Sequence, residues 1–152
     1  MKDGISFSRA ETCMVMEPRH SNIMGNVHGG ELMMMMDNAA GIAAFKHAKG
    51  DAVTARVDEI VFLKPVHIGD IVTCVGQLTY VGKSSMQIMV SIYVNDFSAE
   101  SMPEASLTAF FTMVHLVDGV PTEVPRLVPR TPEDHALYQL GEKKYFEIKA
   151  KL

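Results

Sequence analysis

Residues 22–37, NIMGNVHGGELMMMMD, join a polar, glycine-bearing loop to the start of a long apolar helix. The run 29–48 is rich in Leu, Met and Ala, which favour helices, and it contains no proline. Because its apolar residues continue nearly all the way round, we expect this helix to be buried on most sides. Gly41 within it predicts close backbone packing, and a basic last turn followed by Gly50 is typical of a helix C-terminus.

After this helix the apolar residues alternate in the way that strands require. We predict a short strand over 12–16 before the helix and long strands over 52–63, 71–81, 84–97 and 105–117 after it. A helix that is apolar all round, beside long antiparallel strands in meander order, must be wrapped by those strands. The predicted fold class is therefore α+β, with one antiparallel sheet curled around one central helix.

The C-terminal part of the chain has a different composition. Four prolines interrupt regular structure there, and Thr131 followed by Pro132 indicates a helix start, so we predict a short amphipathic helix over 135–144. We place one domain at residues 1–120 and a C-terminal extension at 121–152. Three arrangements of this extension are open: a cap on a functional site, packing on the sheet, or no fixed place.

Composition restricts the class of protein. The chain has 152 residues, the size of one domain, and its 47% hydrophobic residues are enough for a core. A net charge of −4 argues against a nucleic-acid partner. The two cysteines, Cys13 and Cys74, have no disulfide or metal spacing, and we expect two buried thiols. Residues 1–11 lack the apolar segment of a signal peptide and the longest apolar run, 32–36, is too short to cross a membrane, so we expect a cytoplasmic protein without a membrane partner.

The helix start and Asp37 supply the parts of an acyl-transfer site. Gly29 and Gly30 open the helix, where free backbone N–H groups and the positive end of the helix dipole can hold a developing oxyanion. Alternatively, these glycines only form a tight turn. Asp37 is an acid among methionines and alanines, costly to bury without a partner or a role. It is therefore a candidate general base or, as an alternative catalytic role, a nucleophile, or else a structural acid bonded to the backbone.

The spacing of these groups predicts an assembly of two chains. Asp37 lies eight residues after Gly29, which is about 12 Å along one helix. An attacking water must lie about 3 Å from both its base and the acyl carbon, so one helix cannot supply both groups to one acyl carbon. Two antiparallel helices from two copies can, which predicts a twofold homodimer with shared sites.

Two further polar residues precede the helix. Asn22 could orient a water or polarise a carbonyl, or it could simply stabilise a turn. His28 is a candidate general base, or else a packing or hydrogen-bonding residue beside the glycine pair. The histidines show no metal-ligand spacing and no G-x-S-x-G elbow occurs, so we expect no metal and no serine nucleophile of that type.

Other candidates could contact a nucleotide's phosphates or a pantetheine arm, because they are basic, carry hydroxyls or permit close approach of the backbone. They are Gly82, Lys83, Ser84 and Ser85 between two predicted strands, and the basic residues Arg56 and Lys64. An ordinary hairpin turn and plain surface charges are the alternatives.

Five segments, in this order, resemble the hotdog-fold acyl-CoA thioesterases. The most similar subgroup contains the cytosolic brain-type acyl-CoA hydrolases and their small bacterial counterparts. The segments are N-x-x-G-N-V-H-G-G followed by M-D within 22–37, VTARVD at 53–58, FLKPV at 62–66, IGD at 68–70 and VGKSSM at 81–86. The resemblance covers roughly residues 12–117.

The resemblance implies a function that the residues alone do not. Such proteins hydrolyse fatty acyl-CoA to the free acid and CoA, with CoA as part of the substrate and no separate cofactor. They form dimers with a continuous sheet, commonly arranged as trimers of dimers. An asparagine at the Asn22 position and an acid at the Asp37 position act together across the interface, and the hairpin segment touches CoA, with Lys83 where Arg is frequent. Two alternatives stay open: a non-catalytic acyl-CoA binding module, and a hydratase or dehydratase that would use His28.

Overall fold

The computed structural model describes residues 7–98, 100 and 103–152. The predicted central helix is confirmed over its full length, and each predicted strand is present with ends that differ by a few residues. The elements are β1 (Arg9–Val15), the 3-10 turn η1 (Pro18–His20), α1 (Gly29–Ala48), β2 (Ala52–Phe62), β3 (Ile71–Val81), β4 (Ser85–Val94), β5 (Leu107–Val117), β6 (Val120–Pro121) and α2 (Pro132–Ala150).

The strands form an antiparallel sheet in the order β1-β3-β4-β5-β2, with β6 paired to β5. β3, β4 and β5 follow one another as a meander. β2 pairs with β5 rather than with β3, so the predicted meander is wrong for β2. The alternation of apolar residues identifies a strand but not its neighbour, because that neighbour is chosen by residues far apart in the sequence, such as Val57 and Phe111.

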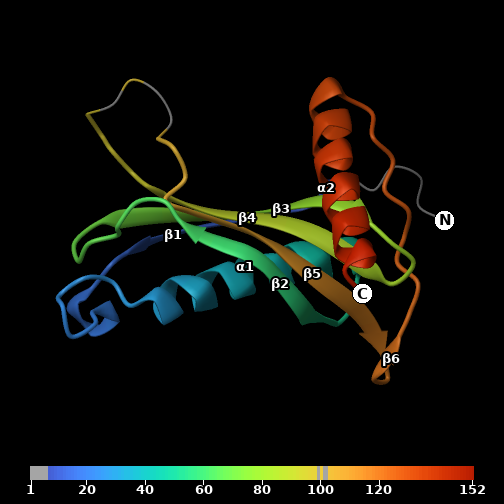
Figure 1. The fold of residues 1–152 in the computed structure, drawn as a ribbon, viewed down its shortest axis with the longest axis horizontal. Coiled ribbons are helices and arrows are strands. Elements are labelled where there is room, and N and C mark those ends of the chain that lie inside the picture. Colours follow the sequence, from blue (N-terminus) through green and yellow to red (C-terminus); the bar gives the residue numbers. More distant parts are fainter. Residues whose placement is uncertain (1–6, 99, 101–102) are drawn as a thin grey trace.

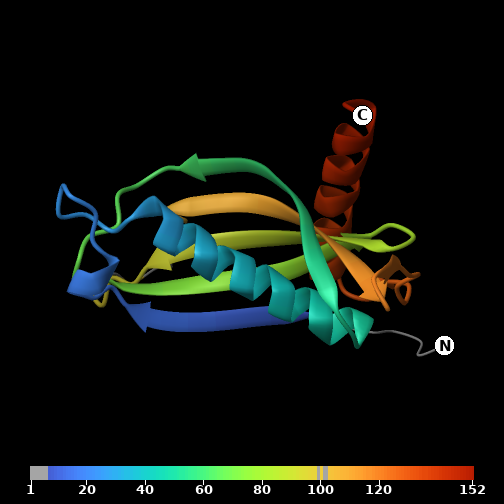
Figure 2. The ribbon, with the colours of Figure 1, turned by 90° about the horizontal axis from the view of Figure 1, so that it is seen from below.

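The sheet separates the two helices. α1 runs diagonally across one face, between the edge strands β1 and β2 (Figure 2). α2 packs on the other face, against β3 and β4 (Figure 1). β3 and β4 are therefore covered on both sides, and most of their side chains are buried. α1 approaches β3 closely at Gly76, where an added Cβ atom would lie 2.8 Å from the carbonyl oxygen of Ala39.

α1 is covered on one side only in the single chain. Nine of its residues are buried, whereas Met33, Met34, Ile42 and Phe45 are exposed. An added Cβ atom at Gly41 would meet nothing within 4 Å, so the close packing predicted there is not found within the chain. The sheet curls around one side of the helix, and the expectation of burial on most sides is therefore wrong for a single chain.

The C-terminal extension packs on the sheet. α2 starts at its predicted cap but continues to Ala150, beyond the predicted end at residue 144. It continues because Tyr145 and Ile148 extend, at helical spacing, the face that meets the sheet. Ile148 is buried, and the Tyr145 ring lies against Tyr80 of β3 with centroids 5.0 Å apart. No helix of the described residues is both long and apolar enough to cross a membrane.

The two cysteines have different environments. Cys74 on β3 is buried, and burial raises the pKa of its thiol to about 12. Cys13 is exposed, so the prediction of two buried thiols is wrong for it. The reason is that Cys13 lies on β1, an edge strand whose side chains are mostly open to solvent. The raised pKa makes Cys74 a poor nucleophile.

Candidate active site

Asp37 is held by a hydroxyl group on the neighbouring strand. The side chain of Thr54 on β2 donates a hydrogen bond through Oγ1 to Asp37 Oδ1 at 2.5 Å. Asp37 is exposed in the single chain, although we expected a buried acid, because the sheet leaves this side of α1 open. Thr54 is not among the predicted site residues. It lies in the segment 53–58 that carries the family resemblance, but its pairing with the helix acid follows only from the folded chain.

The Asp37–Thr54 pair lies in an open groove between α1 and the β2–β5 pair. Ile42 and Phe45 of α1 and Val53 of β2 give this groove an apolar lining. A carboxylate offers about four acceptor positions, and a single hydroxyl occupies one of them. Asp37 therefore keeps acceptor positions for a hydrogen bond from a molecule in the groove.

The start of α1 is capped by His28. Its Nδ1 accepts a hydrogen bond from the Gly30 N–H at 3.0 Å, as an N-cap side chain does. The Gly30 N–H, which we expected to face an oxyanion, therefore has an acceptor inside the chain. The Gly29 N–H has no acceptor among residues 7–98, 100 and 103–152, and the ring of Phe62 lies near this glycine. The first turn of α1 thus presents the Gly29 N–H as its free donor.

The Asn22 side chain stabilises the loop before α1. Its Oδ1 accepts hydrogen bonds from the backbone N–H groups of Met24 at 2.9 Å and Asn26 at 3.1 Å. Asn22 thus has the turn role that we considered as an alternative. Within the described part of the chain its Nδ2 has no acceptor, so this role leaves an amide N–H donor for a molecule outside the chain.

Residues 82–85 connect β3 to β4. The Gly82 N–H donates to the carbonyl oxygen of Ser85 at 2.9 Å. An added Cβ atom on Gly82 would lie 2.6 Å from Ser85 Oγ and 3.0 Å from the Tyr145 hydroxyl, so only glycine fits here. Lys83 is exposed, and it forms no ion pair with the residues that the structure describes. The hairpin therefore presents an unpaired cation to solvent.

Arg56 and Lys64, the other predicted phosphate contacts, are paired within the chain. Arg56 Nε lies 2.9 Å from Asp58 Oδ1. Lys64 Nζ lies 3.5 Å from Glu104 Oε2, and both of these side chains are exposed. An exposed ion pair holds its partners weakly, so Lys64 can readily leave Glu104. Arg56 is held more firmly because its partner, Asp58, is buried.

That buried acid, Asp58 on β2, lies in an ion-pair cluster with α2. Burial favours a higher pKa for Asp58, but the hydrogen bond and charge of Arg56, together with nearby lysines, outweigh burial and lower this pKa. Lys144 of α2 lies 3.6 Å from Asp58 Oδ2 and 3.3 Å from Glu147. These pairs tie α2 to β2 on the face of the sheet opposite to α1.

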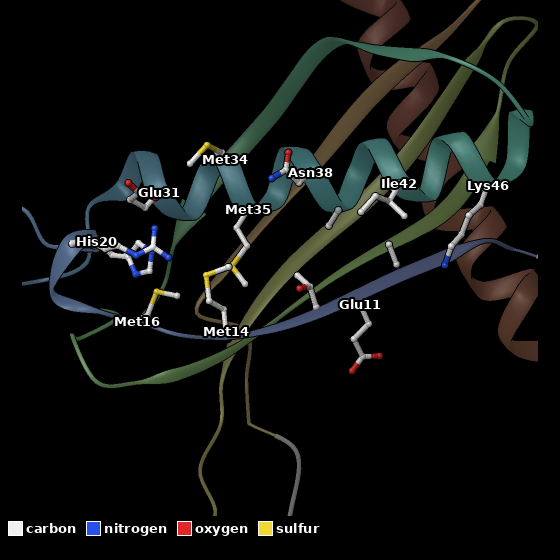
Figure 3. Close-up of a pocket in the computed structure, with 14 residues that line it drawn as sticks. Glu11, Met14, Met16, His20, Glu31, Met34, Met35, Asn38, Ile42 and Lys46 are labelled. Carbon is white, nitrogen blue, oxygen red and sulfur yellow. The ribbon is translucent and has the colours of Figure 1, made fainter.

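A methionine-lined groove of about 380 Å³ runs between α1 and β1. Met35 of α1 points toward Met14 of β1, and His20 and Glu31 lie toward the start of the helix (Figure 3). Met34 also lines the groove. Thioether side chains are flexible and polarisable, and they adapt to irregular apolar shapes. The groove is therefore suited to a flexible apolar chain.

Comparison with known proteins finds relatives over most of the chain. Residues 24–96 match the family model of the Thioesterase superfamily. The "Cytosolic acyl coenzyme A thioester hydrolase" of Rattus norvegicus is 35% identical over 149 residues, which cover 97% of this chain but 39% of the rat protein. The chain thus spans well under half of that relative. The "Uncharacterized acyl-CoA thioester hydrolase YkhA" of Bacillus subtilis is 35% identical over 133 residues, 87% of this chain and 77% of the relative.

Solved structures resemble the whole chain. An acyl-CoA hydrolase from Staphylococcus aureus, in complex with butyryl coenzyme A, coenzyme A and coenzyme A disulfide, has a TM-score of 0.88 and 31% identity, covering 98% of this chain and 91% of that one. Structures also exist of its variants in which an asparagine, an aspartate or a threonine is replaced by alanine. An apo-hexameric acyl-CoA thioesterase has a TM-score of 0.87 and 28% identity, covering 97% of this chain and 95% of that one.

These similarities agree with the architecture of the chain. An antiparallel sheet curled over one long helix, together with the match to the S. aureus structure, confirms the predicted α+β hotdog fold. The relationship to the B. subtilis protein extends over most of both chains. The chain therefore belongs to the acyl-CoA thioester hydrolase family of the thioesterase superfamily.

Proposed function

We propose that this protein hydrolyses acyl-CoA thioesters to the free acid and CoA, at sites that two copies of the chain share. The observation that carries the proposal is Asp37, an exposed acid in the middle of a mostly apolar helix, whose carboxylate is oriented by Thr54. A positioned carboxylate beside an apolar groove is suited to act as a general base on water. The S. aureus relative, bound to CoA, has alanine variants at an asparagine, an aspartate and a threonine, the residue types of Asn22, Asp37 and Thr54.

The exposed face of α1 and the neighbouring strand edge support an assembly of two chains. Met33, Ile42 and Phe45 of α1 and Val53 of the edge strand β2 are exposed near Asp37. Exposed apolar patches and unpaired strand edges are typical of interaction surfaces. We infer that two copies pair along this face with antiparallel α1 helices. Such dimers would assemble further as trimers of dimers, in line with the hexameric state named for a similar acyl-CoA thioesterase.

The mechanism follows from this pairing, because the start of one α1 then faces the middle of the other. Asp37 accepts a proton from a water molecule, whose oxygen attacks the thioester carbon. The free backbone N–H of Gly29 of the partner subunit holds the oxyanion, and the N–H of Gly30 of the partner subunit joins it only when it gives up its hydrogen bond to the His28 ring of the same chain. Asn22 of the partner subunit orients the water or the thioester. The C–S bond breaks, the CoA thiolate leaves, and the proton passes from Asp37 to solvent or to the thiolate.

We place the CoA moiety along the hairpin 82–85. Lys83 is exposed and unpaired among the described residues, so it is free to meet a phosphate group. Arg56 and Lys64 are further candidates, but each must share its charge with an acid of the chain, Asp58 or Glu104. Lys83 is therefore the basic residue with the largest expected contribution to CoA binding.

We place the acyl chain in the methionine-lined groove between α1 and β1. Asn38, Ile42 and Lys46 line both this groove and the groove that contains Asp37, so the two grooves meet along one side of α1. An apolar lining of this size favours fatty acyl chains over short ones. Because a relative is named as cytosolic, we also propose a cytoplasmic location.

Hydrolysis of palmitoyl-CoA and butyryl-CoA, followed by thiol release, tests the proposal. We expect the wild type to have a lower KM for palmitoyl-CoA. We expect Asp37→Ala to lower kcat on the order of 10²–10⁴-fold through loss of the general base. Thr54→Val should lower kcat/KM about tenfold, the effect of losing one hydrogen bond to a charged group.

Asp51→Ala is the matched control, because Asp51 is an exposed acid that lines the same groove as Asp37. Its activity should stay within about twofold of the wild type, as for most surface substitutions. Equal turnover by Asp37→Ala and wild type would refute the role of Asp37. CoA binding by the wild type without any thiol release would favour the non-catalytic binding module. A monomer that cleaves thioesters at full rate would rule out the shared site.

A further inference from the structure

Residues 124–126, which we call the strap, cross from the β3–β4 hairpin to the C-terminal end of α1. The N–H of Val124 donates to the carbonyl oxygen of Lys83 at 2.9 Å, and the Val124 side chain is buried in the core. The carbonyl oxygen of Pro125 accepts a hydrogen bond from His47 Nε2 at 2.8 Å, in the last turn of α1. The strap therefore links the proposed CoA hairpin to the helix that carries Asp37.

The third residue of the strap, Arg126, holds the hairpin by its carbonyl groups. Its Nη2 donates to the carbonyl oxygens of Gly82 at 2.7 Å, Val124 at 2.8 Å and Lys83 at 3.2 Å. Hydrogen bonds from a guanidinium group are stronger than those between neutral groups, and its planar shape fixes their directions. Arg126 thus determines which way the backbone of Gly82 and Lys83 turns.

α2 supports the same hairpin from a second side. The Tyr145 ring lies so close to Gly82 that an added Cβ atom would be 2.9 Å from its Cε2. With its carbonyl groups turned toward Arg126, the hairpin leaves the Lys83 side chain exposed and the two serines half-buried. Only the part of the hairpin that could bind an anion remains open to solvent.

We propose that Arg126 is a positioning residue for CoA binding: by holding the carbonyl groups of the hairpin, it presents Lys83, Ser84 and Ser85 to the CoA phosphates or pantetheine arm. This inference rests on the proposed acyl-CoA function and adds a residue that sequence reasoning did not single out. Its Nη2, the nitrogen that faces the hairpin, is shared among three carbonyl groups, so the role that we assign to Arg126 is on the hairpin backbone.

The test compares Arg126→Ala, Arg126→Gln and the control Arg130→Ala in the full-length chain. Gln keeps N–H donors for the carbonyl groups but lacks the charge. Arg130 belongs to the same extension, is exposed, and makes no side-chain hydrogen bond or ion pair with the described residues. The measurements are the Kd for CoA by calorimetry, KM and kcat for butyryl-CoA, and amide hydrogen exchange across residues 82–85.

We expect Arg126→Ala to weaken CoA binding and raise KM about tenfold, the loss of a hydrogen bond from a charged group, with kcat nearly unchanged and faster exchange in the hairpin. Arg126→Gln, whose amide nitrogen lies two bonds nearer the backbone than Nη2, should recover part of the affinity, and Arg130→Ala should match the wild type. Faster hairpin exchange in Arg126→Ala with an unchanged Kd would overturn the inference.

A second result would also overturn it: CoA affinity lost in Arg126→Ala while hydrogen exchange in the hairpin stays as in the wild type, because Arg126 would then act on the ligand by its charge. If Arg126→Ala does not fold, Arg126→Gln decides alone, since tenfold weaker CoA binding in a variant with wild-type exchange contradicts positioning. Calorimetry with CoA needs no turnover. A wild type that binds CoA but does not hydrolyse thioesters therefore refutes the proposed hydrolase while the role of Arg126 is still measured.

Discussion

The two faces of the sheet provide opposite environments for an acidic side chain. On the face of α1, Asp37 is exposed and has a neutral hydroxyl partner, Thr54. On the face of α2, Asp58 is buried and lies against two cations, Arg56 and Lys144. A carboxylate surrounded by cations is held in its charged form, whereas the exposed Asp37 has a single hydroxyl partner and is open to a molecule in the groove. We infer that the α2 face uses its acid for structure and the α1 face keeps its acid for chemistry.

The two faces also differ in how a helix meets β3. Where α1 meets β3, the carbonyl group of Ala39 lies against Gly76, so the glycine at this contact is on the strand. α2 rests with Gly141 on Thr79 and Tyr80, so the glycine belongs to the helix. In both cases a missing side chain lets a helix approach the sheet. α1 then adds many buried apolar residues, whereas α2 buries only Gly141 and Ile148 and relies also on ion pairs.

The strongest test of this comparison is Asp58→Ala. It leaves Arg56 and the nearly buried Lys144 without their shared partner, and we expect the free energy of unfolding to fall by about 3–5 kcal/mol, as when one partner of a buried ion pair is removed. Urea denaturation measures the change. Asp37→Ala is the control and should stay within about 0.5 kcal/mol, as for an exposed residue. Equal losses in the two variants would contradict the division of roles.

The same acid gives wild-type stability a pH dependence. The pKa of Asp58 in the folded chain lies below its ordinary value of 3.8, so its stabilising contribution is complete above that value. The contribution is lost as the pH falls through the lowered pKa, where the folded chain also takes up the proton. Asp58→Ala should therefore differ from wild type less at strongly acidic pH than at neutral pH.

A smaller effect is expected from Gly141→Ala, which tests how closely α2 meets the sheet. The added Cβ atom would lie 2.7 Å from the Cβ atoms of both Thr79 and Tyr80. Overpacking of this kind costs about 1–3 kcal/mol, although alanine favours a helix by about 1 kcal/mol over glycine. We expect lower stability in thermal or urea unfolding. Thr79→Ala removes the Thr79 hydroxyl, which also lies against the added atom, and should reduce part of the cost of Gly141→Ala. An unchanged cost in that background would show that the hydroxyl is not the source of the crowding.

The smallest expected effect concerns His47, where the strap meets the end of α1. Burial lowers the pKa of His47, the hydrogen bond to Pro125 partly opposes this, and the charge of Arg126 lowers the pKa further. At a pH between the pKa of His47 in the folded chain and its ordinary value of 6.5, His47 is protonated in the unfolded chain but not in the folded chain. Stability should therefore decrease as the pH falls below 6.5, by at most about 1.4 kcal/mol per pH unit.

The variant His47→Gln isolates this contribution, because Gln keeps an N–H donor for Pro125 but does not titrate. Its unfolding free energy in urea should depend less on pH than that of the wild type between about pH 7.5 and 5.5. Parallel pH profiles of the two proteins would show that His47 is protonated equally in the folded and unfolded states.

Sequence reasoning succeeded where the cause is local. The bounds of α1 follow from helix-forming residues, the polar, glycine-bearing loop before it and the basic turn at its end, which all lie within one segment. The partner of β2 could not be predicted in this way, since β5 is distant in the sequence. For the same reason the sequence alone suggests that Arg56 is an unpaired cation. In the fold Arg56 forms an ion pair with Asp58, which also lies near Lys144 of the extension.

The candidate site shows the same division. The residue types at Asn22, Gly29, His28 and Asp37 could be identified from the sequence, because spacing along one helix and the preceding loop is local information. Their environments could not: Asp37 is exposed rather than buried, and the Gly30 N–H donates to His28. Thr54 and Arg126 were missed because each acts on a segment far from it along the chain.

By itself, the sequence determined one apolar helix with an acid in its middle and donors at its start, because helix propensity, periodicity and capping act over a few neighbouring residues. It also predicts that the acid and the donors lie too far apart along one helix to act on one acyl carbon, from which we propose a site shared by two chains. Only the tertiary structure decided which side of α1 stays open, which strand borders Asp37 and what holds the 82–85 hairpin. Those choices depend on contacts between distant residues, and such contacts exist only once the sheet has closed around the helix.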